Sequence, residues 1–135
     1  MNTTKYMIVS ALLTLCTLLS SCGKDGQTSN NPSSLIIGDW LCVKLEKSSN
    51  NGEITTDYSP SLQLSFTSTI VKFVSNHEFQ YQYTLDSSTK GLYFAGCLFG
   101  TINKLTHEEL VIDTKGGYYN VAGEADDAIL YFKKK

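Results

Sequence analysis

Residues 78–85 read Glu-Phe-Gln-Tyr-Gln-Tyr-Thr-Leu and alternate between apolar and polar side chains. Successive side chains of a β-strand point to opposite faces, whereas apolar residues recur every three or four positions in an amphipathic helix. The three aromatic residues, Phe79, Tyr81 and Tyr83, are therefore expected on a packed face, and the glutamines between them on a face in water. This segment predicts a strand of an antiparallel sheet with one solvated face.

A period of two and an excess of β-forming residues extend from residue 35 to the end of the chain. Further strands are predicted at residues 35–47, 62–66, 69–74, 92–94, 97–105, 110–114 and 128–133. Seven or eight short strands joined mostly by tight turns favour a small antiparallel barrel or a sandwich. We expect the barrel, an all-β fold, because closure removes the sheet edges that promote aggregation.

Residues with turn chemistry separate these strands. The run Ser49-Asn50-Asn51-Gly52 suits a tight hairpin, because Asn-Gly tolerates positive φ angles. Gly96 and Gly100 are expected at bends or β-bulges. Thr106 is expected to cap a single helical turn, and residues 115–127 to form a long loop or an irregular hairpin.

An apolar run at residues 6–19 follows a short, positively charged start that contains Lys5. This run is long enough for the hydrophobic part of a signal peptide and too short to cross a bilayer. The segment Leu19-Ser20-Ser21-Cys22 resembles the lipobox of bacterial lipoproteins. The resemblance implies cleavage before Cys22 and attachment of a lipid to its sulfur. An ordinary secretory signal with a chance cysteine is the alternative.

The lipobox implies three segments: a signal peptide at residues 1–21, a lipidated tether at residues 22–34 and one domain at residues 35–135. The tether segment contains no large apolar side chain after Cys22, which is typical of flexible linkers. Two or three acyl chains would hold the protein firmly at a membrane. We expect it at the bacterial cell envelope, at the outer membrane, on either the periplasmic or the surface face.

The charge pattern argues against nucleic acid as a partner. The formal net charge is −2, every basic residue is a lysine, and the one charge run is Lys133-Lys134-Lys135. Nucleic-acid-binding proteins carry a basic patch, and arginine is favoured for bidentate recognition of phosphate. The expected partners are the membrane, through the lipid anchor, and a small apolar ligand or an envelope protein.

Cys42 and Cys97 are the two cysteines that remain after residues 1–21 and the lipidated Cys22 are set aside. In an oxidising compartment this pair could form a disulfide. Two free, buried thiols are the alternative, since cysteine packs well as a small apolar residue. Their spacing contains no Cys-x-x-Cys unit, which argues against a zinc site.

The motif Gly38-Asp39-Trp40 at the start of the first predicted strand resembles the lipocalin Gly-x-Trp element. Together with the lipobox, Lys-Leu-Thr-His-Glu-Glu-Leu at residues 104–110 and Tyr-Phe-Lys-Lys at 131–134, the layout is similar to small lipocalin-like lipoproteins of Bacteroidota. The resemblance covers residues 35–135 and implies a lipocalin-like barrel. It also implies a basic residue over Trp40, for which Lys133 and Lys134 are the candidates, although true lipocalins are longer and often use arginine there.

Patterns for catalysis and for metal binding are weak. His107-Glu108-Glu109-Leu110 lacks the second histidine of a zinc-protease helix, and His77 is the one other histidine. The chain has no Gly-x-Ser-x-Gly motif, and the three acids at residues 124–127 lack an EF-hand pattern. We therefore expect no catalytic residue, no metal and no cofactor.

The aromatic side chains allow two functional interpretations. They could line a cavity for a small apolar ligand, or they could fill the interior of a small barrel completely. Recognition is expected in the loops at the open end, where Tyr118, Tyr119 and Asn51 offer stacking faces and amide groups. We expect a non-catalytic binding module for a small apolar ligand or an envelope partner protein. A structural or accessory lipoprotein with a filled core is the alternative.

Overall fold

The computed structural model describes residues 31–117 and 127–135, which contain one short helix and nine strands. The elements are α2 (Pro32–Leu35), β1 (Gly38–Ser48), β2 (Ile54–Asp57), β3 (Gln63–Phe66), β4 (Ile70–Val74), β5 (Glu78–Leu85), β6 (Gly91–Phe94), β7 (Cys97–Leu105), β8 (Glu109–Asp113) and β9 (Asp127–Lys134). Three residues of the expected sites, Cys22, Tyr118 and Tyr119, lie outside the described residues.

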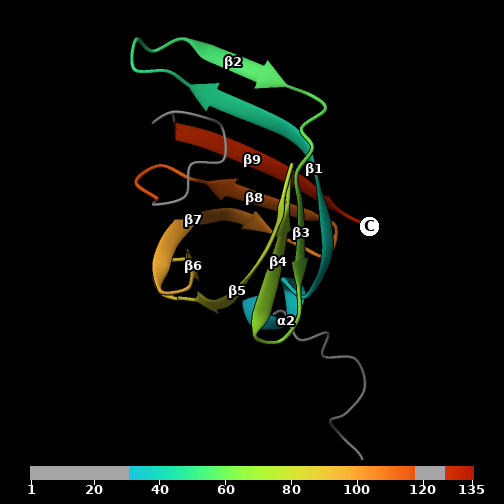
Figure 1. The fold of residues 1–135 in the computed structure, drawn as a ribbon. Helices are drawn as coiled ribbons and strands as arrows, with labels where there is room; N and C mark the ends of the chain where they lie inside the picture. Colours follow the sequence, from blue (N-terminus) through green and yellow to red (C-terminus); the bar gives the residue numbers. More distant parts are fainter. Residues whose placement is uncertain (1–30, 118–126) are drawn as a thin grey trace, which may run out of the picture.

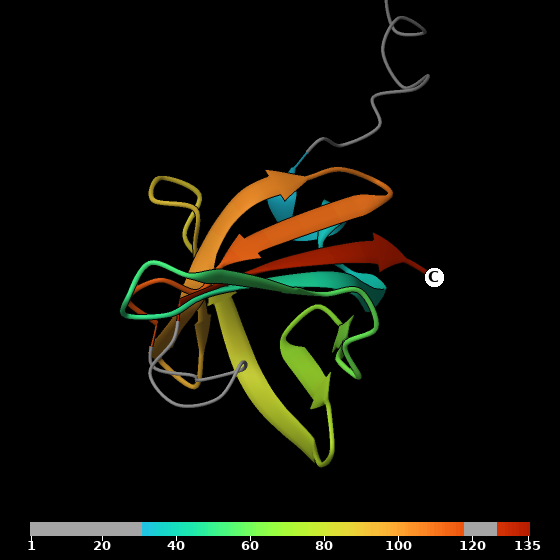
Figure 2. The same cartoon turned by 90° about the horizontal axis from the view of Figure 1, so that it is seen from above.

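Eight of the strands form a closed antiparallel barrel. From β3 to β9 each strand pairs with the next one along the chain, and β1 pairs with both β3 and β9 to close the ring (Figure 1; Figure 2). The ninth strand, β2, pairs with β1 and has no second neighbour among the described strands. The expectation of a small antiparallel β-barrel is confirmed.

Strand β1 changes partner along its length. Its first part, Gly38 to Leu41, pairs with β3, and its last part, Leu45 to Ser48, pairs with β2. Both parts pair with β9, with a register shift between Cys42 and Lys44. Such a bulge increases the local twist of a strand, and it lies where β1 passes from one partner to the other.

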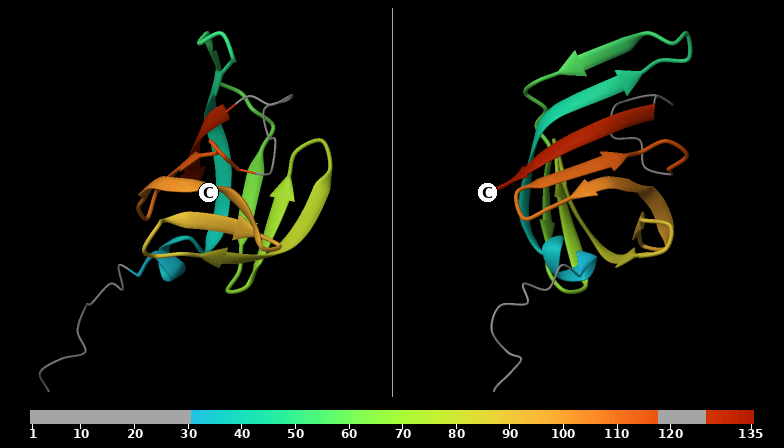
Figure 3. Two further views of the ribbon diagram at one scale, coloured as in Figure 1. Left: turned by 90° about the vertical axis from the view of Figure 1, so that its left-hand side faces the viewer. Right: turned by 180° about the vertical axis from the view of Figure 1, so that it is seen from behind.

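The two ends of the barrel differ in structure. The turns at residues 67–69, 86–90 and 106–108 and helix α2 lie at one end, which we call the helix end. The β1–β2 hairpin and the turns at residues 75–77 and 95–96 lie at the other, which we call the mouth end. Figure 3 shows from two further sides that α2 and the tip of the hairpin are at opposite ends.

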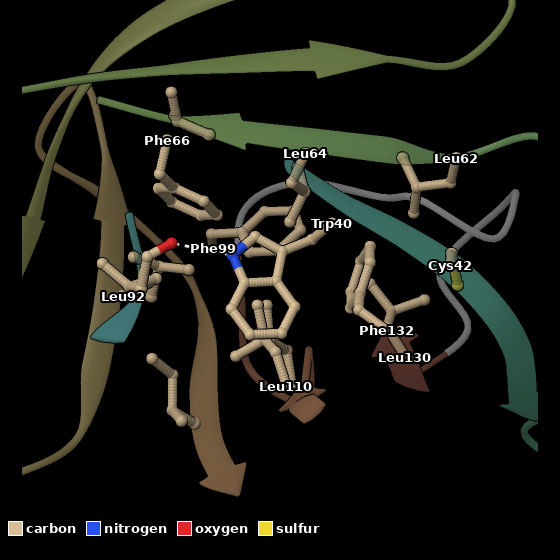
Figure 4. Packing of buried hydrophobic residues seen from close by; sticks show 14 of the residues in the cluster. Trp40, Cys42, Leu62, Leu64, Phe66, Leu92, Phe99, Leu110, Leu130 and Phe132 are labelled. Carbon is tan, nitrogen blue, oxygen red and sulfur yellow. Dashed lines mark hydrogen bonds between the residues drawn. The ribbon is translucent and has the colours of Figure 1, made fainter. Parts of the chain in front are cut away.

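Apolar side chains fill the barrel between these ends. The side chains of Trp40, Leu64, Phe99, Leu110, Leu130 and Phe132 point toward one another (Figure 4). These residues and Phe94 are all 1% exposed or less. Phe94 and Phe99 stack with ring centroids 4.3 Å apart, near the closest spacing of aromatic pairs. The interpretation of the aromatic residues as a filled core therefore holds for this part of the barrel.

Trp40 joins the helix end to the core. Its Nε1 donates a hydrogen bond to the carbonyl oxygen of Ile36 over 2.7 Å, and the Lys134 ammonium lies 4.9 Å from the centre of its rings. Lys134 also donates to the carbonyl oxygen of Leu35. Of the two lysines that were candidates to cover the tryptophan, Lys134 is the one in contact.

The contact between Lys134 and Trp40 requires a glycine at position 38. Its φ angle is +127°, and a Cβ atom on it would lie 2.7 Å from Cε of Lys134. Only glycine adopts this backbone conformation readily, so the motif supplies both the positive φ and the space for the lysine.

Four local predictions differ from the structure. Helix α2 begins within the segment assigned to the tether, where Pro32 occupies its first turn and Asn31 caps it. No strand was predicted at β2. Thr106 starts no helix: its hydroxyl accepts the N–H groups of Glu108 and Glu109, as a cap would, but β8 begins at Glu109 and the segment is a hairpin turn. Phe79, expected on the packed face, is 46% exposed, because it lies one position inside β5 at the mouth end.

The two glycines expected at bends have separate roles. Gly96 and Ala95 both have positive φ, so they form the two-residue turn between β6 and β7. Gly100 lies beside a register shift in that hairpin, as expected for a bulge. A Cβ atom on Gly100 would lie 2.6 Å from the Asp113 carbonyl oxygen, so glycine allows β8 to approach closely.

Candidate binding cleft at the mouth of the barrel

A cleft of about 450 Å³ opens at the mouth end, between β2 and the mouth-end parts of β3 and β4. It is lined by residues from β1, from β2, from the segment before β3 and from the end of β4: Leu45, Lys47, Thr55, Thr56, Asp57, Pro60, Ser61, Leu62, Phe73, Ser75 and Asn76. We call it the mouth cleft. Its volume is within the usual range of small-molecule sites.

The change of partner along β1 creates this cleft. Because β2 occupies the edge of β1 from Leu45 onward, β3 pairs with β1 only as far as Leu41. Between β2 and β3, the Cys42 N–H donates to the Leu62 carbonyl oxygen over 2.9 Å and holds the chain against β1. From that bond toward the mouth end, β2 and β3 diverge, and the space between them is the mouth cleft.

The β1–β2 turn fixes the direction of the hairpin. The Gly52 N–H donates to the Ser49 carbonyl and the Ser49 N–H to the Glu53 carbonyl, both over 2.9 Å, and Gly52 has φ of +83°. This is a three-residue loop with glycine in the left-handed conformation, one of the common hairpin loops. The prediction of a hairpin at this Asn-Gly pair is confirmed.

The floor of the mouth cleft is apolar, and its walls are polar. Leu45, Leu62 and Phe73 all pack on or belong to the core and provide an apolar floor. Hydroxyl and amide groups of serine, threonine and asparagine line the walls. Lys47 and Asp57 contribute one charge of each sign, so the lining carries no net formal charge. Such a surface suits an uncharged ligand with both apolar and hydrogen-bonding parts.

A column of aromatic rings closes the barrel beneath the mouth. Phe73 contacts Phe99 edge to face at 6.2 Å, Phe99 stacks on Phe94, and Phe94 stacks on Tyr81 at 5.9 Å. Phe79 stacks on Tyr81 at 6.3 Å and continues the column toward solvent. A ligand in the mouth cleft would therefore rest on the core.

No protein-family model, curated protein or solved structure matches this chain. The candidate site is therefore defined by the residues that line the mouth cleft and by their contacts alone.

Asn51, the one expected binding residue that the structure describes, lies at the exposed tip of the β1–β2 hairpin and does not line the mouth cleft. Its Oδ1 accepts hydrogen bonds from the Glu53 N–H, over 3.0 Å, and from the Ser49 hydroxyl. The side chain therefore stabilises its own turn.

Cys42 and Cys97 are free thiols, so the disulfide that was considered is not formed in the structure. Cys42 is 3% exposed, and its Sγ donates to the Lys44 carbonyl oxygen at 3.4 Å. Burial raises the pKa of the Cys42 thiol to about 11. A thiol of this kind is a packing group and reacts slowly.

The two histidines lie at opposite ends of the barrel, His77 in the β4–β5 turn and His107 in the β7–β8 turn. Within residues 31–117 and 127–135, no three histidine, cysteine or acidic side chains gather as a metal site would require. Over the same residues, no helix has the length and apolar character needed to cross a membrane.

Sequence reasoning missed the residues of the cleft, above all those of β2. Ile54, Thr55 and Thr56 are β-branched and follow an Asn-Gly turn after one residue, Glu53, which is the signature of the second strand of a hairpin. The sequence therefore contained a recognisable signal for strand β2. No pattern indicated that Phe73 and Leu62 would meet them across a gap, because the gap arises from the change of partner along β1.

Proposed function

We propose that this protein is a non-catalytic binding module, held at the bacterial cell envelope by a lipid on Cys22, and that the mouth cleft is its binding site. The observation that carries the proposal is an uncharged cleft with an apolar floor, open at one end of an otherwise filled barrel. Rigid scaffolds with recognition at one end are common among β-barrels.

The position of α2 supports this arrangement. The segment from Cys22 leads into α2, and α2 lies at the helix end, opposite the mouth (Figure 1). A lipid on Cys22 would place the helix end toward the membrane and the mouth cleft toward the aqueous phase. The binding partner would then reach the cleft from solution.

A lipocalin-like relationship is the second part of the proposal. Its support is the closed barrel together with the Gly38-Asp39-Trp40 motif, in which a basic side chain, that of Lys134, covers Trp40. The lipobox at Leu19–Cys22 supports the lipoprotein assignment, and the wider sequence layout supports an origin in Bacteroidota.

The filled core favours a second candidate function, an accessory lipoprotein with no ligand. Phe94, Phe99 and Trp40 occupy the volume in which a larger barrel would enclose a ligand. The two functions differ in what they require of the mouth cleft. A binding module needs an open cleft, whereas an accessory protein would keep its function with the cleft filled.

Native mass spectrometry of the lipidated protein, purified from its own envelope, tests the proposal. Ser61→Trp would fill the rim of the cleft, and Ser48→Trp would add the same bulk at an exposed position of β1 outside the lining. We expect a co-purifying ligand or partner with the wild type and with Ser48→Trp, and its loss with Ser61→Trp. A bare protein in all three preparations, or equal capture by both variants, would reject the cleft as the site.

A further inference from the structure

Strand β2 has one edge without a partner among the described strands. It pairs through four residues with β1 and lies at the end of the strand order. All four residues are exposed, and Ile54 is 69% exposed. Natural proteins usually protect such an edge with a charged side chain, a proline or a bulge. In β2 the one charged residue is Asp57 at the end of the strand, and the residues from Ile54 to Thr56 contain neither a charge nor a proline.

The register shows which backbone groups point away from β1. Hydrogen-bonded and non-hydrogen-bonded pairs alternate along an antiparallel ladder. The bond from the Ser49 N–H to the Glu53 carbonyl makes that pair a hydrogen-bonded one, so the pairs Lys47–Thr55 and Leu45–Asp57 are hydrogen-bonded too. The N–H and C=O groups of Ile54 and Thr56 therefore point toward the open edge.

This edge borders the mouth cleft. Thr55, Thr56 and Asp57 form one wall, and the opposite wall consists of Phe73 near the end of β4 and Ser75 and Asn76 in the turn after it. A strand that paired with β2 would occupy the place that β3 occupies nearer the helix end. Alternate side chains of that strand would rest on the apolar floor, and the others would face water.

We propose that the mouth cleft binds an extended, uncharged polypeptide segment of a partner protein as an additional strand on β2. Outward main-chain donors and acceptors at strand spacing fit another backbone, whereas a small apolar molecule offers them no hydrogen bond in place of water. The balance of Lys47 and Asp57 favours an uncharged segment. This inference rests on the proposed binding function and specifies its partner.

Fluorescence anisotropy with the full lipidated protein in detergent micelles tests the proposal. The probe is a labelled peptide, acetyl-Gly-Thr-Val-Thr-Val-Thr-Gly-amide, which alternates apolar and hydroxyl side chains. Two matched controls have the same sequence with N-methyl groups on alternate residues, so that each blocks one edge of the strand. We expect saturable binding of the parent peptide and at least tenfold weaker binding of one control, which lacks the hydrogen bonds to β2.

A pair of protein variants tests the same edge from the other side. Thr56→Pro removes an outward N–H without removing a bond to β1, and Thr56→Val keeps that N–H as the matched control. Because both variants lose the threonine hydroxyl and only the proline loses the N–H, we expect Thr56→Pro to bind the peptide at least about fivefold more weakly than Thr56→Val does. Should Thr56→Pro fail to fold, the N-methyl peptides with the wild-type protein decide alone.

Three results would overturn the proposal. They are equal binding of the parent and both N-methyl peptides, no binding of the parent peptide, and a concentration-dependent dimer that Thr56→Pro abolishes, which would make a second copy the occupant. If the peptide fails while a small molecule is lost from Ser61→Trp in mass spectrometry, this inference is wrong and the binding function stands. If both experiments fail, both proposals are wrong.

Discussion

At the scale of single residues, Trp40 connects the core to the chain that enters the barrel. It is fully buried, it holds the Ile36 carbonyl through Nε1, and it lies under Lys134. A side chain with this many simultaneous roles has no close substitute. Its replacement would leave a cavity and an unpaired carbonyl oxygen.

We expect Trp40→Ala to lower the free energy of unfolding by about 3–5 kcal/mol, a large part of the stability of a small domain. Tyr58→Ala is the control, because Tyr58 is 74% exposed and its loss is expected to cost less than about 0.5 kcal/mol. Urea denaturation followed by circular dichroism measures both. Equal midpoints for Trp40→Ala and the wild type would show that the indole contributes nothing to the fold.

The two thiols allow a prediction of reactivity. In the denatured, unreduced protein we expect Cys42 and Cys97 both to react with an alkylating reagent, because neither is in a disulfide. In the native protein we expect Cys97 to react much faster, because Cys42 is buried and its thiol has a pKa of about 11. Mass spectrometry after timed alkylation measures both states. Protection of both thiols in the denatured protein would reveal a bridge.

At the scale of elements, the pairing of β1 with β9 closes the barrel, and one cluster reinforces it on the outer face. The Glu46 carboxylate accepts hydrogen bonds from the Tyr131 hydroxyl over 2.7 Å and from the Lys44 ammonium over 2.9 Å. Lys44 also lies 3.7 Å from the centre of the Tyr131 ring. These hydrogen bonds lower the pKa of Glu46, with the Tyr131 hydroxyl as the largest cause.

Since folding lowers the pKa of Glu46, the charged carboxylate stabilises the fold above its unfolded pKa. That contribution is lost as pH falls through the folded pKa. We therefore expect Glu46→Gln to reduce the melting temperature at pH 7, and we expect the difference from the wild type to shrink as the pH falls toward 3. Thermal denaturation of both proteins across this range measures the difference. A difference that stays constant with pH would show that the charge of Glu46 is not involved.

At the scale of the whole molecule, helix α2, into which the segment from Cys22 leads, and the mouth cleft lie at opposite ends of the barrel. We expect Cys22→Ala to release the protein from the membrane fraction, and globomycin, an inhibitor of the lipoprotein signal peptidase, to cause the uncleaved form to accumulate. Fractionation and immunoblotting measure both. A Cys22→Ala protein that remains in the membrane fraction, with processing unaffected by globomycin, would contradict lipidation at this residue.

The strand pattern was predictable from sequence because it depends on local chemistry. The alternation at residues 78–85 defined β5 with its observed bounds, and residues 97–105 likewise matched β7. The Gly38-Asp39-Trp40 motif indicated where the chain enters the barrel and that a lysine would cover the tryptophan. Each of these predictions needed only side-chain alternation, turn residues or a resemblance carried by a few neighbouring positions.

The mouth cleft depends on contacts between distant parts of the chain. From the sequence, Leu62 and Phe73 were predicted as ordinary core residues of their strands. Asn51 was predicted as a binding residue because it is polar and lies in a turn. The sequence by itself determined an all-β chain with Trp40 at the start of its first barrel strand, since hydrophobic periodicity and turn chemistry are local. Only the tertiary structure decided that β1 exchanges β3 for β2 and so opens a cleft, because strand pairing is set by register and twist across the whole barrel.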